Sequence, residues 1–310
     1  MLIVDTQQTR AALPFGALIA ALHEAFVNPA EVPLRHIHDL GNAVGQPATV
    51  LLMPAWNRRY FGIKTVAVYP GNSARALPGL HSTYMLYDSR SGAPLALLDG
   101  NEITSRRTAA ASALAASRLA REGASSLLVV GAGRVASLLA GAYREVRPIH
   151  RVQVWNLNPA KAEDLARELT EAGFAASAAS DLQSACAEAD IISCATLSTA
   201  PLIQRAWLKP GSHLDLIGGF TPQMRESDDA CFADTEVFVD TGEALIKAGD
   251  LLAPIASGVF NASQVRADLA ALCQGDHPGR TDAAQITVFK AVGTALEDLA
   301  AAQRVYEAHL

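Results

Sequence analysis

Residues 126–136 read Ser-Leu-Leu-Val-Val-Gly-Ala-Gly-Arg-Val-Ala, and this stretch decides the fold. Its apolar run predicts a buried strand, followed by a glycine turn and then by the start of a helix. In such a G-x-G-x-x-[GA] pattern the glycines permit a tight turn and the close approach of a pyrophosphate, while the last small residue packs helix on strand. A glycine turn occurs in any βα unit, but the flanking strand and helix favour a nucleotide site. The predicted cofactor-binding residues of this turn are Gly131, Ala132, Gly133, Arg134 and Val135.

The next predicted strand, 151–156, completes a βαβ unit and bears on the choice of dinucleotide. An acidic residue about 20 residues after the glycines would bind the ribose 2′-hydroxyl of NAD and repel a 2′-phosphate. This chain has Asn156, Leu157 and Asn158 there, which removes the repulsion and supplies hydrogen-bond donors. No arginine clamp is evident, although Arg134 is near in sequence. We therefore expect NADPH or NADH as the cofactor, with NADPH favoured. The alternative is that Asn156 is a plain turn residue.

The composition indicates a globular enzyme rather than a nucleic-acid or membrane protein. The chain has 310 residues, 50% of them hydrophobic, and its formal net charge of −6 gives no electrostatic footprint for nucleic acid. The sequence contains neither a run of 18 apolar residues nor a signal-peptide pattern, so we expect a cytoplasmic protein. The four cysteines are widely scattered and are expected to be reduced and mostly buried, so neither a metal site nor a disulfide is predicted.

Three blocks follow one another along the chain. The first, up to about residue 98, has a predicted helix at 15–26 and strand-like runs at 49–54, 60–69 and 82–88. An alanine-rich, helix-favouring segment at 101–122 leads into the third block, where helices alternate with apolar runs at 191–194, 213–218 and 237–239. The stretch 286–309 has helical periodicity and is expected to pack on the first block. We predict an α/β protein with a Rossmann-type doubly wound sheet and a smaller α+β domain.

Three cations of the first two blocks are the candidates for substrate binding. Lys64 lies inside a strand-like run, where a charge is unfavourable unless it is paired or faces a cavity. Arg107 lies near the start of the alanine-rich helix, and Arg35 lies in a segment with two histidines. Converging cations would suit a small carboxylate substrate, because guanidinium binds a carboxylate through two parallel hydrogen bonds. The alternative at each position is a solvated surface charge.

Four groups of residues together resemble a known family. They are 61–66 (Phe-Gly-Ile-Lys-Thr-Val), 99–110 (Asp-Gly-Asn-Glu-Ile-Thr-Ser-Arg-Arg-Thr-Ala-Ala), 131–133, and 287–290 with 295–298. In combination they resemble the ornithine cyclodeaminase/μ-crystallin family over nearly the whole chain. The resemblance implies a substrate-binding and dimerisation domain made of residues 1–112 and 285–310. It also implies a Rossmann dinucleotide-binding domain, 113–284, and a homodimer.

The resemblance also implies roles for single residues. Arg35, Lys64 and Arg107 correspond to positions that hold the substrate carboxylate. The residues expected beside the cofactor, in addition to the glycine turn and residues 156–158, are His81, Arg107, Thr108, Ala195 and Thr196.

Phe220 departs from the pattern of true ornithine cyclodeaminases, which carry an aspartate directly after a Gly-Gly pair. A phenyl ring can neither neutralise an ammonium group nor exchange a proton, so cyclisation of ornithine is disfavoured. Residues 218–226, Gly-Gly-Phe-Thr-Pro-Gln-Met-Arg-Glu, resemble instead the Δ1-pyrroline-2-carboxylate reductases of the family. The resemblance therefore implies NAD(P)H-dependent reduction of a cyclic imino acid, to L-proline from the five-membered ring or to L-pipecolate from the six-membered ring.

In that reaction the three cations would hold the carboxylate so that the imine carbon lies against C4 of the nicotinamide. Lys64 is the best candidate for the proton donor, because burial lowers the pKa of a lysine, and Asp215 is a rival acid. The alternatives are ornithine cyclodeaminase or alanine dehydrogenase activity on the same scaffold, or a μ-crystallin-like, NADPH-dependent ligand-binding protein. Retention of all three cations argues against pure binding, because a binder of bulky hydrophobic ligands gains little from them.

Overall fold

The computed structural model describes residues 1–75 and 77–310. Contacts divide the chain into two compact units, residues 1–107 with 294–310 and residues 108–293. The sequence predicts the second boundary at 284/285, whereas strand β14 (Thr287–Lys290) pairs with β11 (His213–Leu216) and β12 (Glu236–Val239) of the second unit. No single helix among the described residues is long and apolar enough to cross a membrane, although the bent pair of α1 (Thr6–Ala12) and α2 (Phe15–Val27) reaches that length and composition together.

The first unit is built on a six-stranded sheet with the order β1-β6-β5-β4-β3-β2. β1 runs parallel to β6, and the other neighbours are antiparallel. Its strands are β1 (Leu2–Val4), β2 (His36–Asp39), β3 (Thr49–Trp56), β4 (Tyr60–Val68), β5 (Leu80–Asp88) and β6 (Pro94–Asp99). Its helices are α1 (Thr6–Ala12), α2 (Phe15–Val27), α3 (Gly41–Val44), the 3-10 helix Pro70–Arg75, the start of α4 (Gly100–Leu119), and α11 (Ala295–Glu307).

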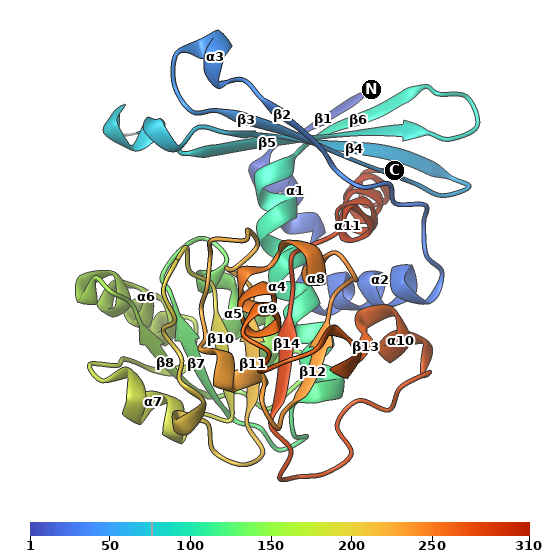
Figure 1. Ribbon diagram of the computed structural model, residues 1–310. Coiled ribbons are helices and arrows are strands. Elements are labelled where there is room, and N and C mark those ends of the chain that lie inside the picture. The colour runs from blue at the N-terminus through green and yellow to red at the C-terminus, as the bar shows by residue number, and fades with distance from the viewer. Residues whose placement is uncertain (76) are drawn as a thin grey trace. The chain divides into compact units, whose positions relative to one another are not determined.

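The two faces of this sheet differ. α11 packs on β3, β4, β5 and β6, and α2 packs against α11 (Figure 1). Side chains alternate along β4 as the pleat requires, so that Gly62, Lys64 and Val66 are buried while the residues between them are partly exposed. In the described residues of this unit, no helix packs on the other face (Figure 1).

The second unit is a doubly wound sheet of eight parallel strands with the order β13-β12-β14-β11-β10-β7-β8-β9. Its strands are β7 (Ser126–Val130), β8 (Arg151–Trp155), β9 (Ala175–Ala178), β10 (Ile191–Cys194), β11 (His213–Leu216), β12 (Glu236–Val239), β13 (Val265–Asp268) and β14. Its helices are the end of α4, α5 (Ala136–Arg144), α6 (Pro159–Glu171), α7 (Leu182–Glu188), α8 (Ala244–Lys247), α9 (Gly249–Ala256) and α10 (Leu269–Gln274), with 3-10 helices at Arg205–Trp207, Asp229–Phe232 and Ala262–Gln264.

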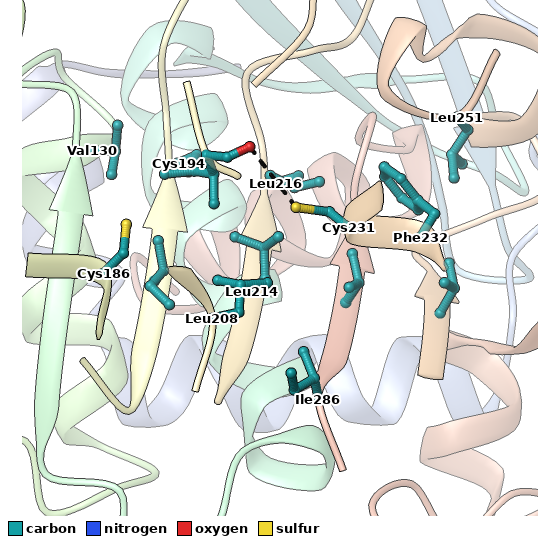
Figure 2. Close-up of a cluster of buried hydrophobic side chains, with 14 of the residues drawn as sticks. Val130, Cys186, Cys194, Leu208, Leu214, Leu216, Cys231, Phe232, Leu251 and Ile286 are labelled. Atoms are coloured by element: carbon teal, nitrogen blue, oxygen red, sulfur yellow. Dashed lines mark hydrogen bonds between the residues drawn. The ribbon is translucent and has the colours of Figure 1, made fainter. Parts of the chain in front are cut away.

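One face of this sheet is apolar and carries most of the cysteines. Alternate residues such as Val130, Cys194 and Leu216 line it, and the thiol of Cys231 contacts the carbonyl oxygen of Ile203 at 3.8 Å (Figure 2). All four cysteines are free and buried in this structure, and their burial agrees with the expectation from the sequence. The opposite face holds a layer of buried polar side chains, which includes Asp215.

The prediction of helical periodicity over 286–309 is wrong for its first part. Residues 287–290 form β14 in the middle of the sheet, and all four side chains are buried. A short strand that is buried on both faces shows no alternation, so its pattern cannot be told from that of a buried helix. The helix begins only at Ala295, where the side chain of Thr294 accepts a hydrogen bond from the backbone N–H of Leu296.

Candidate functional site

The glycine turn has the geometry that a dinucleotide needs. Gly131 has a φ of +114°, and a Cβ there would lie 2.6 Å from the carbonyl oxygen of Ala195. A Cβ on Gly133 would meet no other protein atom within 4 Å, so the space beside this glycine is open. Ala136 is fully buried at the start of α5. The turn therefore fits a pyrophosphate, which the N–H groups at the helix N-terminus would bind.

This turn lies at the point where the order of the sheet reverses. β7 lies between β8 and β10, so the chain builds outward from it in both directions (Figure 1). In open α/β sheets, ligands bind at the carboxyl ends of the strands at such a point. The structure brings the predicted residues 131–135, 156–158, Ala195 and Thr196 to this edge, because they directly follow β7, β8 and β10. Thr108, which begins the second unit, is half-buried on α4.

The end of β8 shows how the two asparagines are used. The side chain of Asn156 donates to the carbonyl oxygen of Asn158 at 3.1 Å. Asn158 in turn caps α6 by accepting from the N–H of Ala160 at 3.1 Å. Leu157 and Arg134 are exposed. Residue 156 thus lies at the end of the strand where the adenosine ribose binds in this class of sheet.

Two of the predicted substrate-binding cations are held by acidic side chains inside the first unit. Lys64 Nζ lies 2.6 Å from Asp298 Oδ2. Arg107 Nε lies 2.9 Å from Asp298 Oδ1, and its NH1 lies 2.7 Å from Glu297 Oε2. All four side chains are at least nine-tenths buried. The expectation that a strand lysine is paired or faces a cavity is confirmed for Lys64 by this ion pair.

The positions of the acidic residues follow from local structure. Glu297 and Asp298 lie in the first turn of α11, where carboxylates interact favourably with the helix dipole. Lys64 lies on the buried face of β4, against which α11 packs. Residues 295–298 carry part of the family resemblance, but the resemblance implies no role for Glu297 or Asp298. The signal that could have found them is the buried lysine, which requires an anion.

The pKa values of Lys64 and Asp298 in this cluster are both lowered, for different reasons. Burial lowers the pKa of Lys64 to about 8, with contributions from the positive charges of Arg107 and Arg35, while Asp298 opposes the shift. Burial disfavours the anion of Asp298, but Lys64 and Arg107 outweigh it and lower the pKa of that carboxyl. Arg35, half-buried just before β2, is therefore close enough to act on Lys64. The cluster therefore holds Arg35, Lys64 and Arg107 together with the carboxylates of Glu297 and Asp298.

His81 is not part of this cluster. It pairs with Ala67 across β4 and β5, so its side chain lies on the face of the sheet opposite Lys64. There it is exposed and lines a cavity of about 490 Å³ together with Thr65 and Thr83.

Asp215, the rival acid, lies in the interior of the second unit. Its carboxylate accepts hydrogen bonds from the hydroxyls of Ser193 at 2.5 Å, Tyr143 at 2.8 Å and Ser112 at 3.2 Å. Burial raises its pKa to about 6, although these three hydroxyls oppose the shift. Its contacts thus join α4, α5 and β10, and a structural role accounts for all of them.

These features define the class of Rossmann-type dinucleotide-binding proteins. The model of the ornithine cyclodeaminase/mu-crystallin family matches residues 8–310, and the chain belongs to this family.

Individual relatives agree with this assignment. A Δ1-pyrroline-2-carboxylate reductase of Paracoccus denitrificans is 41% identical over 86% of this chain and 87% of its own. The structure of the Thermococcus litoralis Δ1-pyrroline-2-carboxylate reductase with NADH and L-proline has a TM-score of 0.93 at 31% identity and covers 99% of this chain and 97% of that one. An archaeal alanine dehydrogenase dimer with bound NAD has a TM-score of 0.92 at 27% identity, covering 99% and 95%.

Proposed function

We propose that the protein is an NAD(P)H-dependent ketimine reductase that converts Δ1-pyrroline-2-carboxylate to L-proline, and that it accepts the six-membered homologue. The observation that carries this proposal is the cluster in which Arg35, Lys64 and Arg107 lie near one another, with Lys64 and Arg107 buried against Glu297 and Asp298. Guanidinium and ammonium groups that converge in this way suit a substrate with a carboxylate. The glycine turn of the second unit and the NADH and proline complex of the Thermococcus relative support the same reaction.

Within this reaction the bound dinucleotide supplies the hydride. Arg35 and Arg107 bind and orient the substrate carboxylate, and Lys64 gives its proton to the imine nitrogen. A lysine with a pKa of about 8 is mostly protonated at neutral pH yet is a stronger acid than an ordinary lysine, which suits a donor. Asp298 holds the ammonium group of Lys64 in place. Phe220 of the second unit is 44% exposed after β11 and offers an apolar surface there.

The test of the proposed activity is a comparison of substrates with the purified protein. NAD(P)H oxidation is followed with Δ1-pyrroline-2-carboxylate, with Δ1-piperideine-2-carboxylate, and with pyruvate plus ammonium, and ammonia release is followed with L-ornithine plus NAD. We expect oxidation with the cyclic imines. Faster turnover of pyruvate would assign the chain to alanine dehydrogenases, and ammonia from ornithine would assign it to cyclodeaminases.

Asn156→Asp is expected to shift cofactor preference toward NADH. A carboxylate at this position would repel the 2′-phosphate and accept a hydrogen bond from a free ribose hydroxyl. We expect the ratio of kcat/KM for NADH to that for NADPH to rise by about tenfold or more, equivalent to about 1.4 kcal/mol. Asn261→Asp is the matched control, because Asn261 caps the 3-10 helix Ala262–Gln264 before β13 and aspartate caps a helix as well as asparagine does. An unchanged ratio in Asn156→Asp would contradict the position given to the ribose.

We further propose a cytoplasmic homodimer that acts in proline metabolism, assembled through the uncovered face of the first unit's sheet. Part of this face is apolar: Phe61 stacks on Tyr87 at 5.2 Å between ring centroids, and Trp56 is 40% exposed. A second copy is the occupant that we favour, since the archaeal relative is a dimer. Light scattering is expected to give the mass of two chains, and Phe61→Glu is expected to give a monomer. A monomeric wild type would refute the proposal.

A further inference from the structure

A buried glutamate joins two loops at the carboxyl edge of the second unit's sheet. The Oε1 atom of Glu226 accepts hydrogen bonds from the backbone N–H of Thr196 at 2.7 Å and from its hydroxyl at 2.8 Å. The Oε2 atom accepts from the backbone N–H of Gly218 at 2.6 Å. Thr196 follows β10 and Gly218 follows β11, so one carboxylate fixes the loops of two neighbouring strands. Glu226 itself is fully buried.

A chain of buried charges fixes Glu226 from the other side. Its backbone N–H donates to Asp250 Oδ1 at 2.8 Å, and Asp250 Oδ2 lies 3.1 Å from Nζ of Lys290, the last residue of β14. Asp250 and Lys290 are both fully buried. Burial raises the pKa of Glu226 to about 7, which Lys290 and the hydrogen bonds from Thr196 oppose. A substitution at Glu226 therefore changes a buried, fully hydrogen-bonded side chain and not an exposed one.

The glycines show how closely these loops approach. A Cβ on Gly218 would lie 1.9 Å from the carbonyl oxygen of Thr196, and one on Gly219 would lie 2.1 Å from Asp250 Oδ2. The 195–196 backbone in turn lies against Gly131 of the dinucleotide turn, at 2.6 Å from the position of its Cβ. No side chain fits between these backbone segments, so the position of Thr196 sets the border of the crevice at the end of β10.

The orientation of the dinucleotide on the sheet decides which half of it lies beside Thr196. The pyrophosphate binds at the glycine turn after β7, and the adenosine ribose binds at the end of β8 on one side. The other half of the dinucleotide must extend to the opposite side, over the ends of β10 and β11. That is the edge at which Glu226 holds the two loops.

We propose that Glu226 is a positioning residue for the nicotinamide half of the dinucleotide, acting through Thr196 and Gly218. The inference rests on the proposed function only in that a dinucleotide binds, and not on the identity of the imine. Three donors converge on the carboxylate, and an amide at residue 226 would place its NH₂ group against at least one of them. The loops would then separate on the nicotinamide side, while the glycine turn and the end of β8 remain as they are.

The experiment compares two probes by calorimetry on the full-length protein. NADPH contains both halves of the dinucleotide, whereas 2′-phospho-ADP-ribose lacks the nicotinamide. For Glu226→Gln we expect affinity for NADPH to fall by about tenfold or more and affinity for 2′-phospho-ADP-ribose to change less than about twofold. Equal losses for both probes, or no loss for either, would overturn the proposal. Thr196→Val removes only one donor and is expected to give a smaller difference of the same kind, should Glu226→Gln fold poorly.

Asp190→Asn is the matched control for a general loss of stability. Asp190 precedes β10 at the amino edge of the same sheet, and it accepts from the N–H groups of Ser125 at 3.0 Å and Ser126 at 3.2 Å. This variant is expected to lower Tm while the affinities for NADPH and for 2′-phospho-ADP-ribose change by the same factor. If Asp190→Asn instead lowered the affinity for NADPH alone, as expected for Glu226→Gln, the proposal would be overturned. Neither probe requires an imine substrate. If the wild type does not reduce imines but Glu226→Gln still loses affinity for NADPH and not for 2′-phospho-ADP-ribose, the proposed function is refuted and the role of Glu226 stands.

Discussion

Lys64→Met is expected to lower kcat/KM for Δ1-pyrroline-2-carboxylate by about 10³-fold, within the 10²- to 10⁴-fold range that loss of a general acid produces. Methionine keeps the length of the side chain but removes both the proton and one positive charge beside Asp298. The variant should fold, because Arg107 still binds Asp298 and because burial disfavours the charge that is removed. Steady-state kinetics measure the effect, and Lys209→Met, at a partly exposed lysine of the second unit, is the matched control.

The pH dependence of kcat/KM distinguishes proton donation by Lys64 from a purely electrostatic role of its positive charge. Burial lowers the pKa of Lys64 to about 8, so the protonated donor is lost as the pH rises through that value. We expect kcat/KM of the wild type to fall about tenfold per unit above pH 8. Lys64→Arg keeps the charge at all these pH values, because a guanidinium does not deprotonate in this range, and should show a low but flat profile. A fall above pH 8 that persists in Lys64→Arg would assign the titration to another group.

The sequence predicts Lys64 as a functional residue but not its partners, for a physical reason. A lysine at an inward position of a strand requires compensation, and that requirement is visible locally. The compensating Asp298 comes from the first turn of α11, near the other end of the chain, and only the packing of α11 on β4 brings it there. Spacing along the chain carries no information about such a contact.

The dinucleotide turn, unlike the partners of Lys64, can be predicted from local sequence. The strand, the glycines and the start of the helix lie within eleven residues, so one segment predicts the doubly wound unit and its dinucleotide turn. Glu226 lies outside this local pattern, because its role depends on two loops that the sheet order places side by side. The same sheet order makes 287–290 a strand, which local periodicity could not distinguish from a helix.

Gly131→Ala is expected to weaken NADPH binding by about 100-fold or more, since it combines backbone strain of about 1–3 kcal/mol with a steric clash. At a φ of +114° an alanine is strained, and its Cβ would lie 2.6 Å from the carbonyl oxygen of Ala195. The turn and the loop after β10 must then move apart, which alters the crevice on both sides of the pyrophosphate. Fluorescence titration of NADPH measures the affinity, and thermal unfolding is expected to show a lower Tm.

Gly133→Ala distinguishes a clash within the protein from a clash with the ligand. A Cβ there would meet no protein atom within 4 Å, so this variant should keep the Tm of the wild type. The methyl group would nevertheless occupy the space through which a pyrophosphate reaches the backbone, and NADPH affinity should fall by about tenfold or more. Gly123→Ala, in equally open space before β7, is expected to change neither quantity. Full NADPH affinity in Gly133→Ala would mean that the phosphates do not bind at this turn, and the position that we give to the nicotinamide half would then have no basis.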